Sequence, residues 1–235
     1  MIPRYNDALL GDTIEDWQEF NNILLEYRIA EIVQHVNQGP VLDVGCGNGE
    51  ISAAIAELGM LVHGIDPDET KIKKASDIAD IVFEVGDIET WKAPHLYSTV
   101  VCSHVLEHSV NPYTFLMACR NALDIKGKII VTCPNALSLN KRIAEIMELS
   151  ELFKLSVTDK LQDHVVLFDR DRMRGLLIAA GFEVVVESGI MLKPFASAQM
   201  AKYLDARWHD AFYEIGKNED LIDYCSSLLM VGRKR

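Results

Sequence analysis

The chain has 235 residues, of which 49% are hydrophobic and 25% charged, and its formal net charge is −12. This length is enough for one α/β domain with a substantial core. The acidic balance argues against a nucleic-acid partner, because phosphate contacts require clustered Lys and Arg. No apolar run approaches the ~18 residues of a membrane-spanning helix. The N-terminal residues lack the basic and then apolar layout of a signal peptide, so we expect a cytoplasmic protein.

The cysteines support the same expectation of compartment. They are odd in number and show no C-x-x-C spacing, and several lie inside apolar runs. This pattern is typical of small buried residues in a reducing compartment, and no structural zinc site built from them is expected. The five are Cys46, Cys102, Cys119, Cys133 and Cys225.

Short apolar runs alternate with helical patterns along the chain, which predicts βαβ units and a parallel sheet. The first helix is expected over 13–37, within an N-terminal helical segment, 1–37. Strands are expected over 41–44, 61–65, 81–85, 98–102, 128–133, 182–187 and 227–232. Further helices are expected over 51–58, 68–78, 111–123 and 169–180. We therefore predict one domain, 1–235, of the α/β class, with a doubly wound, seven-stranded, mostly parallel sheet.

Two segments fall outside this alternation, 136–164 and 190–224. Each is long, partly helical and placed after a strand on the carboxyl side of the sheet, where open α/β sheets bind ligands. We expect them to form helical lid insertions. Apolar residues at helical spacing are more often core or subunit contacts, so that alternative and a homodimer stay open.

A glycine-rich turn, Gly45 to Gly49, joins the first strand to the next helix. Glycine has no Cβ, so the backbone can bend sharply and lie against a ligand, with the amides of the helix N-terminus facing it. Taken alone, the turn fits either a nucleotide site or a plain tight connection. Its G-x-G-x-G spacing differs from the G-x-G-x-x-G of dinucleotide dehydrogenases, which makes hydride transfer the weaker alternative.

Carboxylates follow at the ends of the next two strands. Asp66 lies about 20 residues beyond the turn, where a carboxylate would accept hydrogen bonds from ribose hydroxyls. Asp87 ends the third strand and is expected beside the same crevice. A strand-end aspartate is usually a cap or turn residue. Two in succession after a glycine turn favour a nucleotide-like ligand.

The residues Val41 to Gly49, V-L-D-V-G-C-G-N-G, resemble the first motif of the class I methyltransferases that depend on S-adenosylmethionine (SAM). The resemblance spans about residues 38–190 and returns in the last strand. It implies a Rossmann-like methyltransferase fold, with SAM as the cofactor and S-adenosylhomocysteine (SAH) as its product. The cofactor-binding residues that it implies are Asp43, Gly45, Cys46, Gly47, Asp66, Pro67, Asp87, Ile88, Ser103 and Arg28.

Within this set the resemblance implies separate roles. The glycines would pass beneath the amino-acid portion of SAM, Asp66 would hold the ribose hydroxyls, and Asp87 would accept from the adenine amino group. Pro67 and Ile88 would pack on the adenine ring. Arg28 resembles an arginine that some relatives direct at the methionine carboxylate, although a solvated charge on a helix face is an equal alternative.

The end of the fourth strand supplies candidate catalytic residues, Glu107 and His108. The sequence V-L-E-H resembles the branch that includes ubiquinone-pathway O-methyltransferases and many sugar and natural-product enzymes. Methyl transfer needs an aligned acceptor and removal of its proton, and histidine titrates near neutrality. We expect His108 to be the base or to orient the acceptor, with Glu107 fixing its tautomer or contacting the cofactor. The alternative is that both residues merely cap the following turn.

A metal is a further alternative at this position. Some relatives place Glu-x-x-Glu-His here with a divalent ion, and a later histidine joins as a ligand in some of them. This chain has His104, Glu107 and His108, with His164 further on as another candidate catalytic residue. Because His104 replaces a carboxylate, the set suits Mg²⁺ less and a softer ion better.

The sequence thus predicts methylation of a small-molecule acceptor, on the oxygen of a sugar, glycan precursor or secondary metabolite. N-methylation of an amine or peptide is a second hypothesis. A non-catalytic SAM-binding partner protein is a third, disfavoured by the intact turn and by the filled end of the fourth strand.

Overall fold

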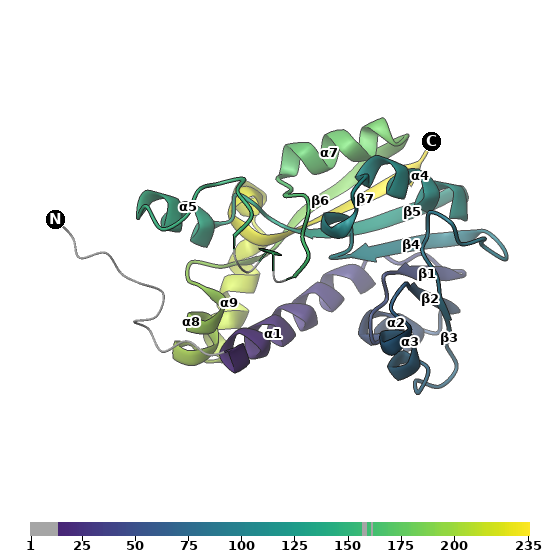
Figure 1. Cartoon of the computed structure of the whole chain (residues 1–235), viewed down its shortest axis with the longest axis horizontal. Helices are drawn as coiled ribbons and strands as arrows, with labels where there is room; N and C mark the ends of the chain where they lie inside the picture. The colour runs from purple at the N-terminus through teal and green to yellow at the C-terminus, as the bar shows by residue number, and fades with distance from the viewer. Residues whose placement is uncertain (1–13, 157–158, 161) are drawn as a thin grey trace.

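The computed structural model describes residues 14–156, 159–160 and 162–235, and it contains one seven-stranded sheet (Figure 1). The strand order is β3-β2-β1-β4-β5-β7-β6, and β7 runs antiparallel to both of its neighbours. The strands are β1 (Val41–Val44), β2 (Val62–Asp66), β3 (Val82–Val85), β4 (Tyr97–Ser103), β5 (Leu123–Pro134), β6 (Phe182–Leu192) and β7 (Cys225–Lys234). The predicted α/β class and mostly parallel sheet are confirmed.

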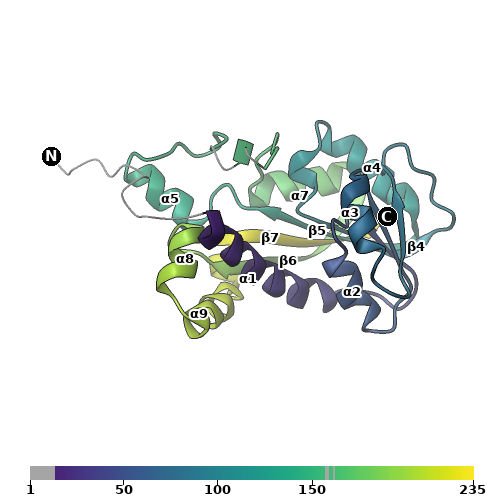
Figure 2. The ribbon, with the colours of Figure 1, turned by 60° about the horizontal axis from the view of Figure 1, so that its bottom comes forward.

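Helices cover both faces of the sheet (Figures 1 and 2). In both views α4 and α7 lie on one face, while α1 and α2 lie on the other. The α-helices are α1 (Ile14–Val33), α2 (Glu50–Ala56), α3 (Glu69–Ala75), α4 (Pro112–Ala122), α5 (Leu139–Ile146), α7 (Arg170–Ala179), α8 (Ser197–Tyr203) and α9 (Ala206–Gly216). The 3₁₀ helices are η2 (Leu106–His108) and η3 (Glu219–Tyr224). Among the described residues, no helix is both long and apolar enough to cross a membrane.

The alternation of side chains along β4 divides the core into two parts. Val100 and Cys102 belong to the cluster that contains α4 and α7. Val101, between them, belongs to the cluster that contains α1, α2 and residues of α8 and α9. Successive side chains of a strand point to opposite faces, so a strand that is apolar throughout is buried on both.

Several elements differ in length from the prediction. Helix α1 ends at Val33, before the predicted 37, and β5 and β6 extend well beyond the predicted strands. In β6, residues 190–192 pair with β7, so the first part of the 190–224 segment is strand. Antiparallel hydrogen bonds to β7 continue β6 beyond the residues whose apolar pattern predicts a strand.

The remainder of the 190–224 segment folds into α8, α9 and η3. Met200 and Tyr213 are buried in the same core cluster as Phe20 of α1. These helices therefore extend the core, and whether they also cover an acceptor stays a prediction. The 136–164 segment is different, because its helix α5 buries none of its residues. Residues 1–13 of the predicted N-terminal segment, and 157–158 and 161 of the 136–164 segment, lie outside the described part.

Parallel pairing brings the ends of three strands to one edge of the sheet. Val44 pairs with Ile65 of β2 and with Cys102 of β4. Gly45 therefore begins the turn between Asp66 on one side and Ser103 on the other. This is the edge at which open α/β sheets bind ligands.

Candidate active site

The glycine turn has a backbone conformation that residues with a side chain rarely adopt. Gly45, Gly47 and Gly49 have φ angles of +70°, +59° and +90°. A Cβ at Gly45 would lie 2.4 Å from Cγ2 of Val105, whereas one at Gly47 would meet nothing within 4 Å. The turn is thus packed against the end of β4 on one side and open at Gly47 on the other. The open side is where a ligand can lie against the backbone.

Asp66 connects the end of β2 to this turn. Its carboxylate accepts hydrogen bonds from the backbone N–H of Gly47 at 3.0 Å and of Asp68 at 2.9 Å. A carboxylate has about four acceptor sites, so these bonds leave sites for ribose hydroxyls. The predicted ribose contact stays a prediction, and the structure shows the side chain held beside the open glycine.

Asp43 lies beneath the turn and is 1% exposed. It accepts a hydrogen bond from Oγ of Ser52 at 2.7 Å. Burial raises the pKa of Asp43 to about 6, against the opposing effect of the Ser52 hydrogen bond. Its contacts show a side chain that joins the end of β1 to α2, and its predicted contact with the cofactor is not tested.

The residues predicted to contact adenine surround the ends of β2 and β3. Asp87 and Pro67 are exposed, whereas Ile88 is buried. Oδ1 of Asp87 accepts from the backbone N–H of Glu89 at 3.0 Å, which orients the carboxylate at the start of a turn. An exposed proline and a carboxylate at neighbouring strand ends fit the predicted adenine site, and their contacts with the ring stay predictions.

Two other predicted cofactor residues are largely enclosed by protein. Cys46 is buried, and its Sγ lies against Gly64 of β2. Burial raises the pKa of Cys46, which makes it a packing residue rather than a nucleophile. Oγ of Ser103 lies 2.9 Å from Oγ1 of Thr132 in β5. Both residues therefore pack against protein at the ligand-binding edge of the sheet.

Arg28 reaches the site from α1. Its Nε is buried without a hydrogen-bond partner in the described part of the chain. Burial lowers the pKa of Arg28 to about 10, and the charges of Glu107 and Glu50 oppose that shift. A buried guanidinium with an unpaired N–H is costly unless an acceptor completes it. The enclosed Nε disfavours the solvated-charge alternative for Arg28, and a ligand carboxylate remains its predicted partner.

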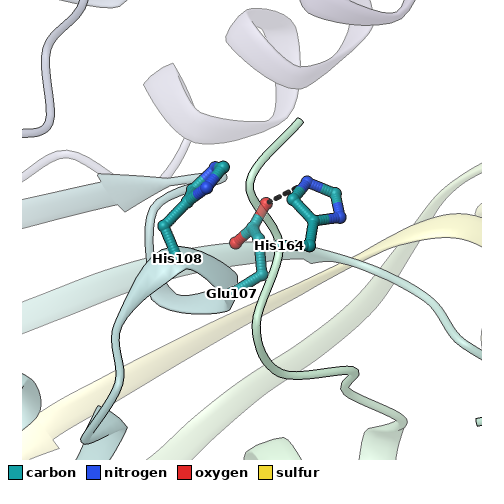
Figure 3. Close-up of side chains that lie close together, drawn as sticks. All are labelled: Glu107, His108 and His164. Carbon is teal, nitrogen blue, oxygen red and sulfur yellow. Dashed lines mark ion pairs between the residues drawn. The ribbon is translucent and has the colours of Figure 1, made fainter. Parts of the chain in front are cut away.

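Glu107 lies in η2, directly after β4, and is 1% exposed (Figure 3). Neither of its carboxylate oxygens has a hydrogen-bond partner among the described residues. Oε1 lies 3.7 Å from Nδ1 of His104 and 4.0 Å from Nε2 of His164. Burial raises the pKa of Glu107 to about 7, although its own backbone N–H, the charges of His164 and Arg28 and the nearby thiol of Cys133 oppose the shift. A buried carboxyl group of this kind is uncommon outside functional sites.

His108 and His164 lie beside Glu107, with ring centroids 5.0 Å apart. Nδ1 of His108 lies 3.3 Å from the carbonyl oxygen of Asp163, so this nitrogen donates and Nε2 is left as the base. Of the two roles predicted for Glu107, fixing the tautomer of His108 is taken by this backbone carbonyl, and contact with the cofactor stays a prediction. Helix α4 is capped by Asn111, so neither Glu107 nor His108 is needed as its cap.

His164 is oriented by a residue that the sequence did not reveal. Its Nδ1 lies 3.2 Å from Oδ1 of Asp159, and both side chains are buried. Asp159 also approaches Nζ of Lys141 at 3.7 Å. No motif marks Asp159 or Lys141, and only the placement of 136–164 as an insertion at the ligand edge pointed to this region.

Glu107, His108 and His164 also form a candidate metal site. One ligand atom from each lies within 4.8 Å of the other two. The unpartnered oxygens of Glu107 fit this assignment, because a cation would satisfy them. His104 is not part of the set, and its Nε2 lies 3.2 Å from Oγ of Ser227. One carboxylate and two imidazoles suit a transition ion better than Mg²⁺.

The strand order, the glycine turn and the Asp66 edge define the class I SAM-dependent methyltransferase fold. Comparison with known families agrees, since the profile described as "Methyltransferase domain" matches residues 18–187. The chain therefore belongs to the methyltransferase domain family.

Similar proteins are found among both curated sequences and solved structures. Ubiquinone biosynthesis O-methyltransferase of Rickettsia felis is 32% identical over 123 residues, which are 49% of this chain and 50% of that protein. The match thus spans about half the length of this curated relative.

Solved structures extend the likeness over nearly the whole chain. A SAM-dependent methyltransferase of Thermotoga maritima, titled a possible histamine N-methyltransferase, has a TM-score of 0.63 at 15% identity, covering 93% of this chain and 96% of that one. Magnesium protoporphyrin IX methyltransferase of Synechocystis PCC 6803, solved with bound SAH, has a TM-score of 0.57 at 16% identity, covering 98% and 89%. At such identities the likeness shows the fold alone.

Proposed function

We propose that this chain is a SAM-dependent methyltransferase that methylates a hydroxyl group of a small-molecule acceptor. The observation that carries the proposal is the buried, unpartnered Glu107 carboxyl group beside His108 and His164, at the same sheet edge as the glycine turn. Membership of the methyltransferase domain family supports it, as does the likeness to ubiquinone biosynthesis O-methyltransferases.

One side of this sheet edge is proposed to bind the cofactor, and the other side to bind the acceptor. On one side, Gly47 and Asp66 offer an open backbone and a carboxylate to the cofactor, and Arg28 supplies a buried cation. SAM supplies a methyl group already activated by its sulfonium. The protein therefore has to align the acceptor, exclude water and remove one proton.

His108 is proposed as the base that removes this proton. His108 is exposed, its Nδ1 faces a backbone carbonyl, and partial desolvation lowers its pKa, so the neutral imidazole with a free Nε2 is favoured near pH 7. The proton passes from the acceptor oxygen to Nε2 as that oxygen takes the methyl group. His164, oriented by Asp159, lies close enough to Glu107 to hold the carboxyl group in place.

A metal-assisted mechanism is the second candidate, favoured by the same unpartnered oxygens of Glu107. A divalent ion on Glu107, His108 and His164 would lower the pKa of an acceptor hydroxyl, and His108 would then be a ligand rather than the base. Metal content and turnover after exhaustive chelation distinguish the two. Full turnover by protein shown to be metal-free supports the base, whereas loss of turnover that returns with Mn²⁺ or Zn²⁺ supports the metal.

The proposal names one reaction but several classes of acceptor. A sugar, glycan precursor or secondary metabolite fits the family branch, while N-methylation of an amine or peptide and non-catalytic SAM binding remain alternatives. A cytoplasmic location is proposed from the cysteines, all of which are buried and free, including Cys102 and Cys119 with their sulfurs 3.7 Å apart. A homodimer and the absence of nucleic-acid binding stay predictions.

The test is incubation with labelled SAM and a metabolite extract, followed by mass identification of the labelled product. Calorimetric titration with SAH, applied to the wild type and to Asp66→Ala, checks the cofactor site separately. We expect SAH to bind, Asp66→Ala to weaken that binding, and label to appear on an oxygen. Unchanged SAH binding in Asp66→Ala, or label on nitrogen, would contradict the corresponding part of the proposal.

A further inference from the structure

Two lysines lie beside the catalytic groups without a role in methyl transfer itself. Lys193 directly follows β6 at the ligand edge of the sheet, and Lys141 lies on α5. The backbone N–H of Asn140 donates to the carbonyl of Lys193 at 3.0 Å, so α5 is attached to the end of β6 at this point. Elements far apart in the sequence thus place Lys193 beside the start of α5, and the charges of Lys141 and Lys193 act on each other.

This place adjoins the proposed active site. Nζ of Lys141 lies 3.7 Å from Oδ1 of Asp159, which lies 3.2 Å from Nδ1 of His164. Nε2 of His164 in turn lies 4.0 Å from Glu107. Lys141 is therefore linked to His164 through Asp159, on the side of the 136–164 insertion.

Lys193 is a half-buried cation that is poorly neutralised. Its Nζ donates to Oγ of Ser197 at 2.9 Å and lies 5.7 Å from the ring centroid of Phe20. Among the described residues, no carboxylate lies within 4 Å of it. Burial lowers the pKa of Lys193 to about 8, the charge of Lys141 acts in the same direction, and Asp159 opposes both.

Asp159 cannot compensate both ammonium groups. Its Oδ2 already accepts from the backbone N–H and the Oγ of Ser156, at 2.9 Å and 2.6 Å, while Oδ1 faces His164 and Lys141. Two lysines and one committed carboxylate leave local positive charge in a chain whose net charge is −12. Partly desolvated positive charge of this kind favours a partner of opposite sign.

We propose that Lys193 and Lys141 form an anion subsite that binds a carboxylate or phosphate group of the methyl acceptor. The inference rests on the proposed function, because it assigns the acceptor of the same site. An anionic group held between these lysines would be anchored by two charge-assisted hydrogen bonds. The hydroxyl to be methylated, elsewhere on the same molecule, would then point past His164 toward His108. The anchored acceptor is aligned before reaction, which is what the methyl transfer requires.

The proposal is tested by the charge of the product. Wild-type protein is incubated with labelled SAM and a metabolite extract, and the labelled products are passed over an anion exchanger at pH 7. We expect the label to be retained. Phosphatase treatment before the column distinguishes the two anions. It removes the phosphate group, so a phosphate-bearing product is no longer retained, whereas a carboxylate-bearing product still binds the column. Label that passes through untreated, as neutral or cationic product, overturns the proposal.

Variants then assign the binding to these lysines. Lys193→Met is expected to lower transfer to the retained product at least tenfold at subsaturating acceptor, through KM rather than kcat, and Lys193→Arg to restore much of it. Lys217→Met is the matched control, because this lysine, directly after α9, pairs with Glu214 and lies outside the cluster. Equal effects of Lys193→Met and Lys217→Met, or a loss in kcat with KM unchanged, overturn the assignment.

Failure of the subsite and failure of the proposed function give different results. Each variant is also titrated with SAH, and its affinity is expected to match that of the wild type. Absence of SAH binding, or of any labelled product from wild-type protein, contradicts the proposed function. SAH binding and turnover on an uncharged acceptor contradict only the anion subsite.

Discussion

The two sides of the candidate site are built by different means. On the cofactor side, the turn from Gly45 to Gly49 and the carboxylate of Asp66 lie at adjacent strand ends, and backbone amides make the contacts between them. On the acceptor side, Lys141, Asp159 and Lys193 come from α5, the 136–164 insertion and the end of β6, and side chains make the contacts. The first side depends on backbone geometry, whereas the second depends on charge.

The two sides also differ in the signal that they leave in the sequence. A turn that requires glycine conformations and one acidic residue leaves a recognisable local pattern in any sequence. A cluster assembled from distant segments leaves none, and each residue in it can be replaced without disturbing the sheet. On the proposed function, we expect the specificity to depend on the acceptor side, because loops on a stable scaffold commonly carry function.

The largest expected effect separates chemistry from binding. His108→Ala should lower kcat by about 10² to 10⁴, because a positioned base contributes that factor. SAH affinity should stay unchanged, since His108 lies on the acceptor side. His95→Ala is the control, because His95 is exposed and lies outside the site. Steady-state kinetics from pH 6 to 9 with SAH calorimetry provide the measurement, and a His108→Ala variant with full turnover would rule out the base.

The next prediction concerns a substitution that disturbs the backbone of the glycine turn on the cofactor side. In Gly45→Val, a side chain would meet Val105, with the new Cβ 2.4 Å from Cγ2, at a φ of +70°. We expect the free energy of unfolding to fall by about 2 to 4 kcal/mol from the left-handed backbone and the overlap together. SAH binding should be lost with it.

Gly175→Ala provides the control for this change. Gly175 lies in α7, and a Cβ there would meet nothing within 4 Å. Replacing a helical glycine by alanine should raise stability by about 0.5 to 1 kcal/mol. Denaturant unfolding measures both variants. Equal stability of Gly45→Val and wild type would show that the turn tolerates a side chain and is not held as described.

The same division sets what could be predicted from the sequence. The strands, the turn and Asp66 followed from apolar runs, glycine spacing and the order of strand ends, which are local signals. Glu107, His108 and His164 were named as candidates, but the partner of His108 could not be named, because the carbonyl of Asp163 reaches it from 55 residues away. Asp159 and Lys193 could not be predicted, because only the folding of the insertion onto the end of β6 gives them neighbours.

A smaller effect is expected on the pH dependence of KM, which tests the acceptor side. Lys193 should be protonated at pH 7 and lose its proton as the pH rises through about 8, since burial lowers its pKa to that value. Among the groups that face it, Asp159 stays ionised throughout, because its hydrogen bonds with His164 and Ser156 and the charge of Lys141 hold its pKa down against the effect of burial. The KM for an anionic acceptor should therefore rise about tenfold between pH 7 and 9, an estimate from losing one charge-assisted contact.

Lys193→Arg sharpens this test, because arginine stays protonated over the whole range. The variant should show a flat KM between pH 7 and 9, while kcat keeps the wild-type profile. A KM that rises equally in the wild type and in Lys193→Arg would place the titrating group elsewhere and remove Lys193 from the subsite.

The smallest expected effect concerns the support beneath the glycine turn. Ser52→Ala removes the hydroxyl that donates to the buried carboxylate of Asp43. An ionised carboxylate without that partner costs about 1 to 3 kcal/mol, whereas a protonated one costs much less. Because burial already raises the pKa of Asp43 to about 6, folding favours its protonated form, and the stability it contributes falls as the pH rises through about 6. The loss in Ser52→Ala should therefore be larger at pH 8 than at pH 5.

Ser76→Ala is the matched control, because Oγ of Ser76 donates to the carbonyl of Ile72, which does not titrate. Its effect on unfolding should be small and the same at pH 5 and pH 8. Denaturant unfolding of both variants at the two pH values makes the comparison. A loss in Ser52→Ala that does not change with pH would mean that Asp43 is not ionised beneath the turn. The support beneath the glycine turn would then be an uncharged hydrogen bond, in contrast to the charged contacts of the acceptor side.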